Sequence, residues 1–149
     1  MYLGIDPGFT GAWGIVNHHG HYISCGDMIV SKDRINTVDV IAEIRQALDM
    51  QDCLVVIEKV HSMPKQGVSS TFKFGMAYGA ALAIAERFQR DPLLIPPATW
   101  KRKMELTGDK IYSLSMARAL WPLAPLARVK DNGRAEALLL AEYLRKEMR

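Results

Sequence analysis

Short apolar runs separated by turns open the chain. Residues 2–6 alternate in the manner of a strand and are followed by a Pro-Gly turn. Further strands are predicted at 11–16 and 21–30, joined by a hairpin turn over 17–20. The first part of the chain is therefore predicted to form consecutive antiparallel strands.

Helical spacing first appears over residues 35–50. We expect Asn36 to cap this helix, with Asp39 in its first turn. Residues 53–57 form a continuous apolar run, which is typical of a strand buried on both faces. The apolar positions that predict the helix are Val38, Ile41, Ile44 and Leu48.

The remaining pattern is mostly helical. A long helix rich in small residues is predicted over 70–88, followed by a short strand at 93–95 that two prolines stop. Later helices are expected at 99–106, with Thr99 as the cap, at 111–120, and from about 132 to 147. This order predicts an α/β fold in which one mixed five-stranded sheet is flanked by helices, with residues 1–149 as a single domain.

Composition narrows the class of protein. Half of the 149 residues are apolar (49%), which is enough for a real core, yet no apolar stretch approaches the roughly 18 residues of a membrane span. The N-terminus has a strand pattern and lacks the features of a signal peptide. Cys25 and Cys53 each lie in a strand-like run and are expected to be small core residues. We therefore expect a cytoplasmic protein without a membrane partner.

Two carboxylates end apolar strands. Asp6 follows the first strand, and Glu58 follows the buried run at 53–57. Ligands of open α/β sheets bind at this edge, and two close carboxylates require either a proton or a cation between them. Oxygen ligands suit Mg²⁺ or Mn²⁺. The alternative is that each acid merely caps a strand beside a loop.

Glu136 is the third candidate acid, near the start of the last predicted helix. An acid there also complements the helix dipole, which is a purely structural explanation. Asn132 lies four residues earlier on the same helical face, beside Asp131. A cluster of carboxylates without His or Cys suits two-metal phosphodiester hydrolysis.

Basic residues offer a surface for phosphate. The net charge is only +3, but Lys101, Arg102 and Lys103 cluster, with Lys65, Lys73 and Lys110 elsewhere in the chain. Such a cluster is equally compatible with a solvated face. The three histidines at 18, 19 and 21 are expected to lie in a solvated turn, because no acidic or Cys partner sits at ligand spacing.

With these residues placed, the chain resembles the RuvC family of Holliday-junction resolvases, specifically its small phage and prophage branch. The resemblance spans nearly the whole chain. It is carried by an ordered set of motifs, namely Gly4-Ile5-Asp6-Pro7-Gly8, Val56-Ile57-Glu58-Lys59-Val60, Phe74-Gly75 with its small-residue helix, Pro96-Pro97-Ala98-Thr99-Trp100-Lys101, Gly108-Asp109-Lys110 and Gly133-Arg134-Ala135-Glu136-Ala137-Leu138.

The resemblance implies a ribonuclease H-like fold, a homodimer, and two Mg²⁺ (or Mn²⁺) ions per active site. It implies paired cuts in four-way DNA junctions within a bacterial host cell. Asp6, Glu58, Asn132 and Glu136 would be the metal-site positions, and Lys110 would lie near the scissile phosphate. The loop after Glu58 would enter the junction, with His61 where cellular members carry a stacking aromatic residue. The expected DNA contacts are His61, Lys65, Gln66, Lys73, Lys101, Arg102 and Lys103.

Asn132 departs from the family pattern, which leads us to expect an acid there. Either Asp131 takes over, or the metal site is weakened, or an Asp→Asn replacement has inactivated the enzyme. Asp131 is about 140° from Glu136 around a regular helix. If residue 132 is a ligand, Asn132→Asp should raise the Mg²⁺-dependent rate at least about tenfold. If it is only a helix cap, the two rates should be equal.

The homodimer is expected to form partly through the helix over 70–88. Phe74, Tyr78 and Leu82 recur at helical spacing, while Gly75 and Gly79 allow close backbone approach. The alternative is ordinary packing of this helix on its own sheet. A two-fold dimer would suit a junction that offers two equivalent strands.

Three other functions remain open. An actin-like phosphotransferase opens with a similar Asp6 loop, but it needs a second lobe for which the chain has no room. A non-catalytic DNA-binding member of the fold would explain Asn132 as a natural loss. A broader flap or fork nuclease would use the same acids without strict junction preference.

Overall fold

The computed structural model describes residues 1–62, 65 and 67–148. A mixed sheet has the strand order β3-β2-β1-β6-β7, with the first three strands antiparallel and β6 and β7 parallel to β1. The predicted five-stranded mixed sheet is confirmed. Its strands are β1 (Tyr2–Asp6), β2 (Ala12–Val16), β3 (Tyr22–Asp27), β6 (Leu54–Glu58) and β7 (Leu93–Ile95).

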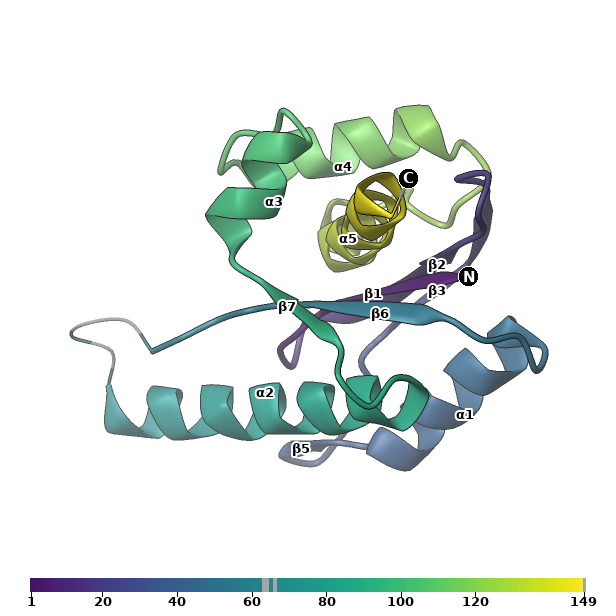
Figure 1. Cartoon of the computed structure of the whole chain (residues 1–149). Helices are drawn as coiled ribbons and strands as arrows, with labels where there is room; N and C mark the ends of the chain where they lie inside the picture. Colours follow the sequence, from purple (N-terminus) through teal and green to yellow (C-terminus); the bar gives the residue numbers. More distant parts are fainter. Residues whose placement is uncertain (63–64, 66, 149) are drawn as a thin grey trace.

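Helices cover both faces of this sheet (Figure 1). The helices α1 (Thr37–Leu48) and α2 (Val68–Phe88) pack on one face. The other face carries α3 (Pro97–Lys103), α4 (Lys110–Leu120) and α5 (Asn132–Glu147). Each face therefore has its own apolar core, and the sheet is buried between the two. Among the residues that the structure describes, no helix is long and apolar enough to cross a bilayer.

The α5 helix lies unusually close to the sheet. A methyl group added at Gly4 would collide with the carbonyl oxygen of Ala137 and lie 2.6 Å from the backbone nitrogen of Ala141. At Gly14 the same group would lie 2.8 Å from the backbone nitrogen of Leu138. These glycines let α5 rest directly on β1 and β2, and the first turns of α5 thereby reach the end of β1.

Two predicted elements differ in the structure. The third strand ends at Asp27, and Met28, directly after it, is buried in the core. A small separate hairpin follows, formed by β4 (Val30–Ser31) and β5 (Arg34–Ile35). The helix predicted at 99–106 runs instead from Pro97 to Lys103. Proline begins helices well because its fixed φ suits the first turn and its missing N–H is not needed there.

The helix α1 confirms its predicted cap and corrects its predicted face. The Asn36 side chain accepts a hydrogen bond from the Asp39 backbone N–H at 3.3 Å. The buried positions are Val40, Ile44 and Leu48, whereas Val38 is 72% exposed. Val38 therefore lies on the solvent face, two residues before Val40, the first buried position of the helix.

The close approach of α5 to β1 gives a stability prediction. Gly4→Ala should lower the free energy of unfolding by about 3 kcal/mol or more, because backbone atoms of α5 cannot move aside as a side chain can. Gly108→Ala is the matched control, since a methyl group there meets open space. Urea unfolding of both variants measures the difference. Equal stabilities would contradict the close packing of α5 on β1.

Candidate active site

Three carboxylates converge at one edge of the sheet. Asp6 ends β1 and Glu58 ends β6, and these strands are parallel neighbours with Ile5 opposite Ile57. Glu136 reaches the same edge from the second turn of α5. Glu58 and Glu136 are only 8% and 6% exposed. The sheet register and the packing of α5 thus bring acids from three distant parts of the sequence together.

The electrostatics show that these acids affect one another. Burial raises the pKa of Asp6 well above its usual value, and the negative charges of Glu136 and Glu58 raise it further. Burial is also the main cause of the raised pKa of Glu58, to which Glu136 adds. Lys101 and Lys110 act in the opposite direction on both groups. The site therefore gathers acids where burial disfavours their ionised form, an arrangement that a bound cation would stabilise.

The short helix α3 fixes two of the acids through neighbouring residues. The indole Nε1 of Trp100 donates to Glu58 Oε1 at 2.9 Å, and Trp100 is completely buried. The Lys101 ammonium donates to Glu136 Oε1 at 2.8 Å. Ser113 Oγ of α4 donates to the same oxygen at 3.1 Å. Both glutamates are thus oriented by donors that the sheet itself does not supply.

Gly133 explains how α5 can approach Asp6. A methyl group at this position would lie 2.9 Å from the carbonyl oxygen of Thr10 and 3.4 Å from Oδ2 of Asp6. The first of these distances is too short for ordinary contact. A side chain at residue 133 would push α5 away from the end of β1, and Glu136 would move with it.

The donor set fits a hard divalent cation. Asp6, Glu58 and Glu136 offer only carboxylate oxygens, which Mg²⁺ and Mn²⁺ prefer. Across the described residues, no three His, Cys, Asp or Glu side chains are close enough in this conformation to share one ion. Lys101 instead provides the positive charge beside Glu136. Loading a metal on all three acids therefore requires these side chains to adjust and Lys101 to withdraw.

Asn132 and Asp131 lie at the start of α5. Asn132 is the first residue of α5, one turn before Glu136, and it lines a pocket with Lys110. Among the described contacts of Glu58 and Glu136, none is a hydrogen bond to Asn132. Asp131 is buried, and Arg128 Nη2 lies 2.6 Å from its Oδ1. That guanidinium holds the pKa of Asp131 below its usual value. Asp131 is therefore paired with Arg128 in this structure, and its role as a metal ligand stays a prediction.

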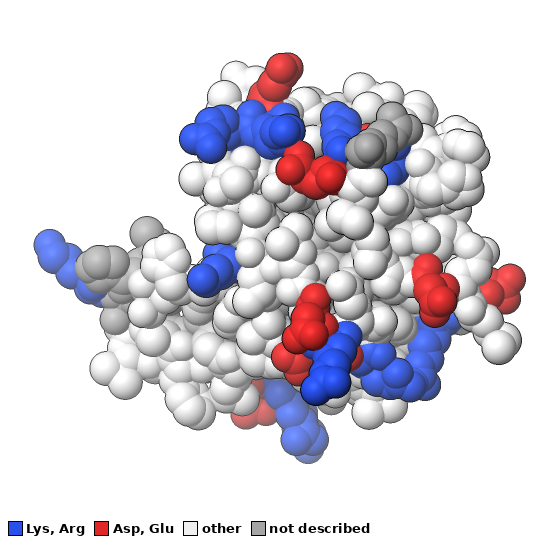
Figure 2. All heavy atoms as spheres, viewed as in Figure 1, with Lys and Arg blue, Asp and Glu red and all other residues white. Residues whose placement is uncertain are grey.

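The basic cluster on α3 divides into two parts. Lys101 faces the acids with 17% of its side chain exposed, whereas Arg102 and Lys103 face solvent. Lys103 forms a surface ion pair with Glu147 at 3.1 Å. In the view of Figure 2, basic side chains gather on the surface over α3, and acidic side chains lie among them. Lys110 is also exposed, and its charge acts on both Asp6 and Glu58.

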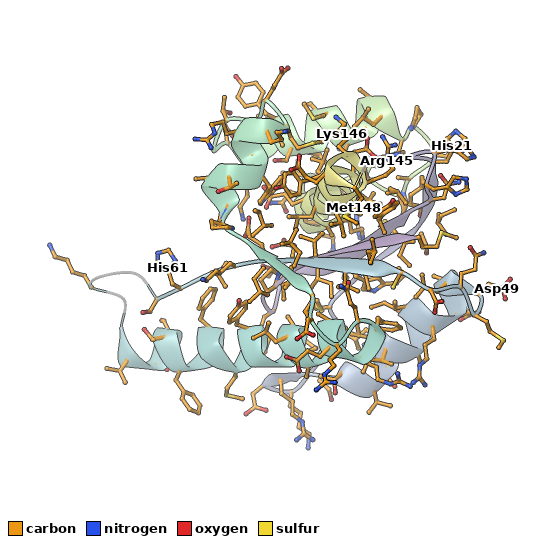
Figure 3. The ribbon with its side chains drawn as sticks, viewed as in Figure 1. His21, Asp49, His61, Arg145, Lys146 and Met148 are labelled. Carbon is orange, nitrogen blue, oxygen red and sulfur yellow. The ribbon has the colours of Figure 1, made fainter. Side chains whose placement is uncertain are left out.

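The other predicted DNA contacts lie around the segment between β6 and α2. His61 is exposed on the chain that continues β6, on the side away from α2 in Figure 3. Lys65 and Lys73 are exposed as well. Gln66 lies outside the described residues. His18, His19 and His21 are exposed in the β2–β3 turn, as predicted.

Sequence reasoning missed Trp100 and Ser113 as members of the site. The sequence does carry a signal for Trp100. It precedes Lys101 and follows soon after the strand at 93–95, which ends at the acidic edge. Ser113 had no such signal, because its role depends on how α4 packs against α5. Arg134 was also missed; it forms a two-pronged ion pair with Asp27 at 2.7 and 2.8 Å, which joins α5 to β3.

Comparison with solved structures identifies the fold. RuvC from Thermus thermophilus in complex with a Holliday junction substrate is 20% identical, with 96% of this chain and 92% of that chain covered and a TM-score of 0.67. A second Thermus thermophilus RuvC structure is 21% identical, with coverage of 95% and 90% and a TM-score of 0.66. No family model matches the chain, and no curated protein matches it. The chain has the RuvC-like, ribonuclease H-like fold that the sequence predicted.

The ion pair between Lys101 and Glu136 gives a second stability prediction. Without metal, Lys101→Met should cost about 2 kcal/mol, because it leaves the buried carboxylate without its cation. Glu136→Gln in the same chain should recover part of that loss. Lys103→Met is the control and should cost less than about 1 kcal/mol, since its pair with Glu147 is exposed. Urea unfolding in EDTA compares the variants. Equal losses for Lys101→Met and Lys103→Met would contradict the assigned role of Lys101.

Proposed function

We propose that this protein is a metal-dependent endonuclease that cuts branched DNA, with four-way junctions as its preferred substrate. The observation that carries the proposal is the convergence of Asp6, Glu58 and Glu136 at one sheet edge, where burial and mutual repulsion favour a cation. The likeness to RuvC bound to a Holliday junction supports the choice of substrate.

In this proposal, Asp6, Glu58 and Glu136 hold Mg²⁺ or Mn²⁺, with two ions per site. Bound divalent ions activate a water and stabilise the leaving oxygen during phosphodiester hydrolysis. Trp100 and Ser113 keep the two glutamates oriented toward the site. Lys110 carries its positive charge at the exposed rim, where it can bind the phosphate backbone. Asn132 is not among the ligands that we propose.

The exposed basic residues would bind the arms of the junction. Arg102 and Lys103 lie beyond Lys101 on the outer side of α3, while Lys65 and Lys73 flank the segment after β6. Phosphate contacts of this kind fix the position of DNA without reading its sequence. His61 lies on that same segment, where we propose that it and Gln66 approach the junction centre.

We also propose a homodimer through α2, but with a different face from the one expected. Tyr78 and Leu82 pack against the protein's own core. The exposed stripe is formed by Val68 at 90%, Phe72 at 68% and Met76 at 39% exposure. Beside it, added methyl groups at Gly75 and Gly79 would meet open space. A second copy of this chain would cover the stripe and place two active sites on one junction.

The nuclease proposal predicts that metal ligation and DNA binding can be separated. Asp6→Asn should abolish cleavage of a labelled four-way junction in Mg²⁺ while leaving its affinity largely intact, because phosphate contacts supply most of the binding. Glu43→Gln, on α1, is the control and should cut normally. A panel of junction, fork, flap and linear duplex shows which substrate is preferred. Cleavage by Asp6→Asn at the parent rate would overturn the assignment.

The dimer proposal predicts that one charge on α2 is sufficient to separate the subunits. Phe72→Glu should shift the protein to a monomer in light scattering, because the interface would bury the new carboxylate. Val38→Glu introduces the same charge at a similarly exposed apolar position on α1 and should leave the assembly unchanged. If the parent protein is monomeric both free and bound to a junction, the proposal fails.

A further inference from the structure

A pocket of about 660 Å³ adjoins the acidic site. It lies between the first turns of α4 and the junction of α5 with a short 3-10 turn, η1 (Val129–Asp131). Its volume falls within the range of pockets that hold small organic groups. Its lining combines basic, apolar and amide side chains, which come from Lys110, Ile111, Leu114, Val129, Lys130 and Asn132.

Lys110 connects the pocket with the acids. It lines the pocket from the first turn of α4. Ser113, three residues later on the same helix, donates to Glu136. One side of α4 therefore faces the acids while its first turn faces the pocket. A group bound in the pocket would lie next to a phosphate held at the acids.

The walls of the pocket are apolar and open to solvent. Ile111 is 61% exposed and Val129 is 84% exposed, while Leu114, which also lines the pocket, is buried. Exposed apolar side chains that line one pocket are suited to contact the faces of a flat, weakly polar group. In the absence of such a group these two side chains gain little from their positions.

The polar groups at the rim favour an anionic ligand with a hydrogen-bonding edge. Asp109 also lines the pocket, but its carboxylate accepts a hydrogen bond from the Ile111 N–H at 3.0 Å. Arg118 is occupied by the carbonyl oxygens of Leu126 and Ala127, at 2.7 and 2.9 Å. Lys110 and Lys130 form no ion pair among the described residues, so with Arg118 they make the pocket lining cationic despite Asp109. Asn132 adds an amide that can both donate and accept.

We propose that this pocket receives one nucleotide of the substrate strand, next to the phosphate that is cut. The base lies between Ile111 and Val129, its phosphates contact Lys110 and Lys130, and Asn132 reads its polar edge. Residue 132 thereby becomes a specificity residue rather than a metal ligand. This inference rests on the proposed nuclease function, and it adds the site where the enzyme would sense base identity.

The test uses 2-aminopurine, which fluoresces more strongly when it leaves the base stack. The probe is placed in turn at each position flanking the cleavage site of a four-way junction. Binding is measured in EDTA, so that no strand is cut. The parent protein should raise the fluorescence at one flanking position. The double variant Ile111→Ser, Val129→Ser should remove that rise and weaken binding about fivefold, because it removes the apolar contacts to one base. Val38→Ser is the matched control and should leave both unchanged.

Residue 132 is tested separately by base substitution at the responding position. The parent should bind the four base variants of the junction with unequal affinity, and Asn132→Ala should make these affinities nearly equal. Junction binding without any fluorescence rise, or a rise that survives the double variant, overturns the pocket alone. An Asn132→Asp variant that cuts at least about tenfold faster with unchanged base preference would restore the metal-ligand role. Absence of junction binding by the parent overturns both this inference and the nuclease proposal.

Discussion

Three carboxylates buried together at one sheet edge are the constraint on which the arrangement of α3, α4 and α5 depends. Burial raises the pKa of Asp6 and of Glu58, and the charge of nearby Glu136 raises both pKa values further. Lys101 and Lys110 offset part of this cost. A protein under selection for stability alone would replace such acids with apolar side chains. Their presence together indicates that the site exists for a ligand of opposite charge.

The elements on that face of the sheet supply what the acids need. The α3 helix provides a hydrogen bond from Trp100 and a cation from Lys101, and α4 provides Ser113 and the charge of Lys110. Glycines at the contact between α5 and the sheet allow Glu136 to come close. In this account, Lys101 holds the metal-free site together and must yield its place when divalent ions bind. The same arrangement leaves the first turn of α4 free to form the neighbouring pocket.

The sequence was sufficient to predict the sheet and its acidic edge because both depend on local patterns. Buried strands that end in Asp6 and Glu58 are visible without a structure, as is the late helix that carries Glu136. Side-chain direction was harder to predict. Lys101, Arg102 and Lys103 are equivalent in sequence, and only the burial of Trp100 decides which lysine turns inward. Helical spacing predicts Asn132 one turn before Glu136, and α5 confirms that placement, but the pocket that Asn132 lines beside α4 depends on tertiary packing that the local pattern does not show.

The central claim is that the three acids bind divalent metal by displacing Lys101. Diffraction from crystals grown with Mn²⁺, measured with its anomalous signal, tests this claim most directly. The account predicts at least one Mn²⁺ peak bonded by carboxylate oxygens of Asp6, Glu58 and Glu136, with the Lys101 ammonium withdrawn from Glu136. Saturating Mn²⁺ that leaves the acids empty and Lys101 still paired with Glu136 would contradict it.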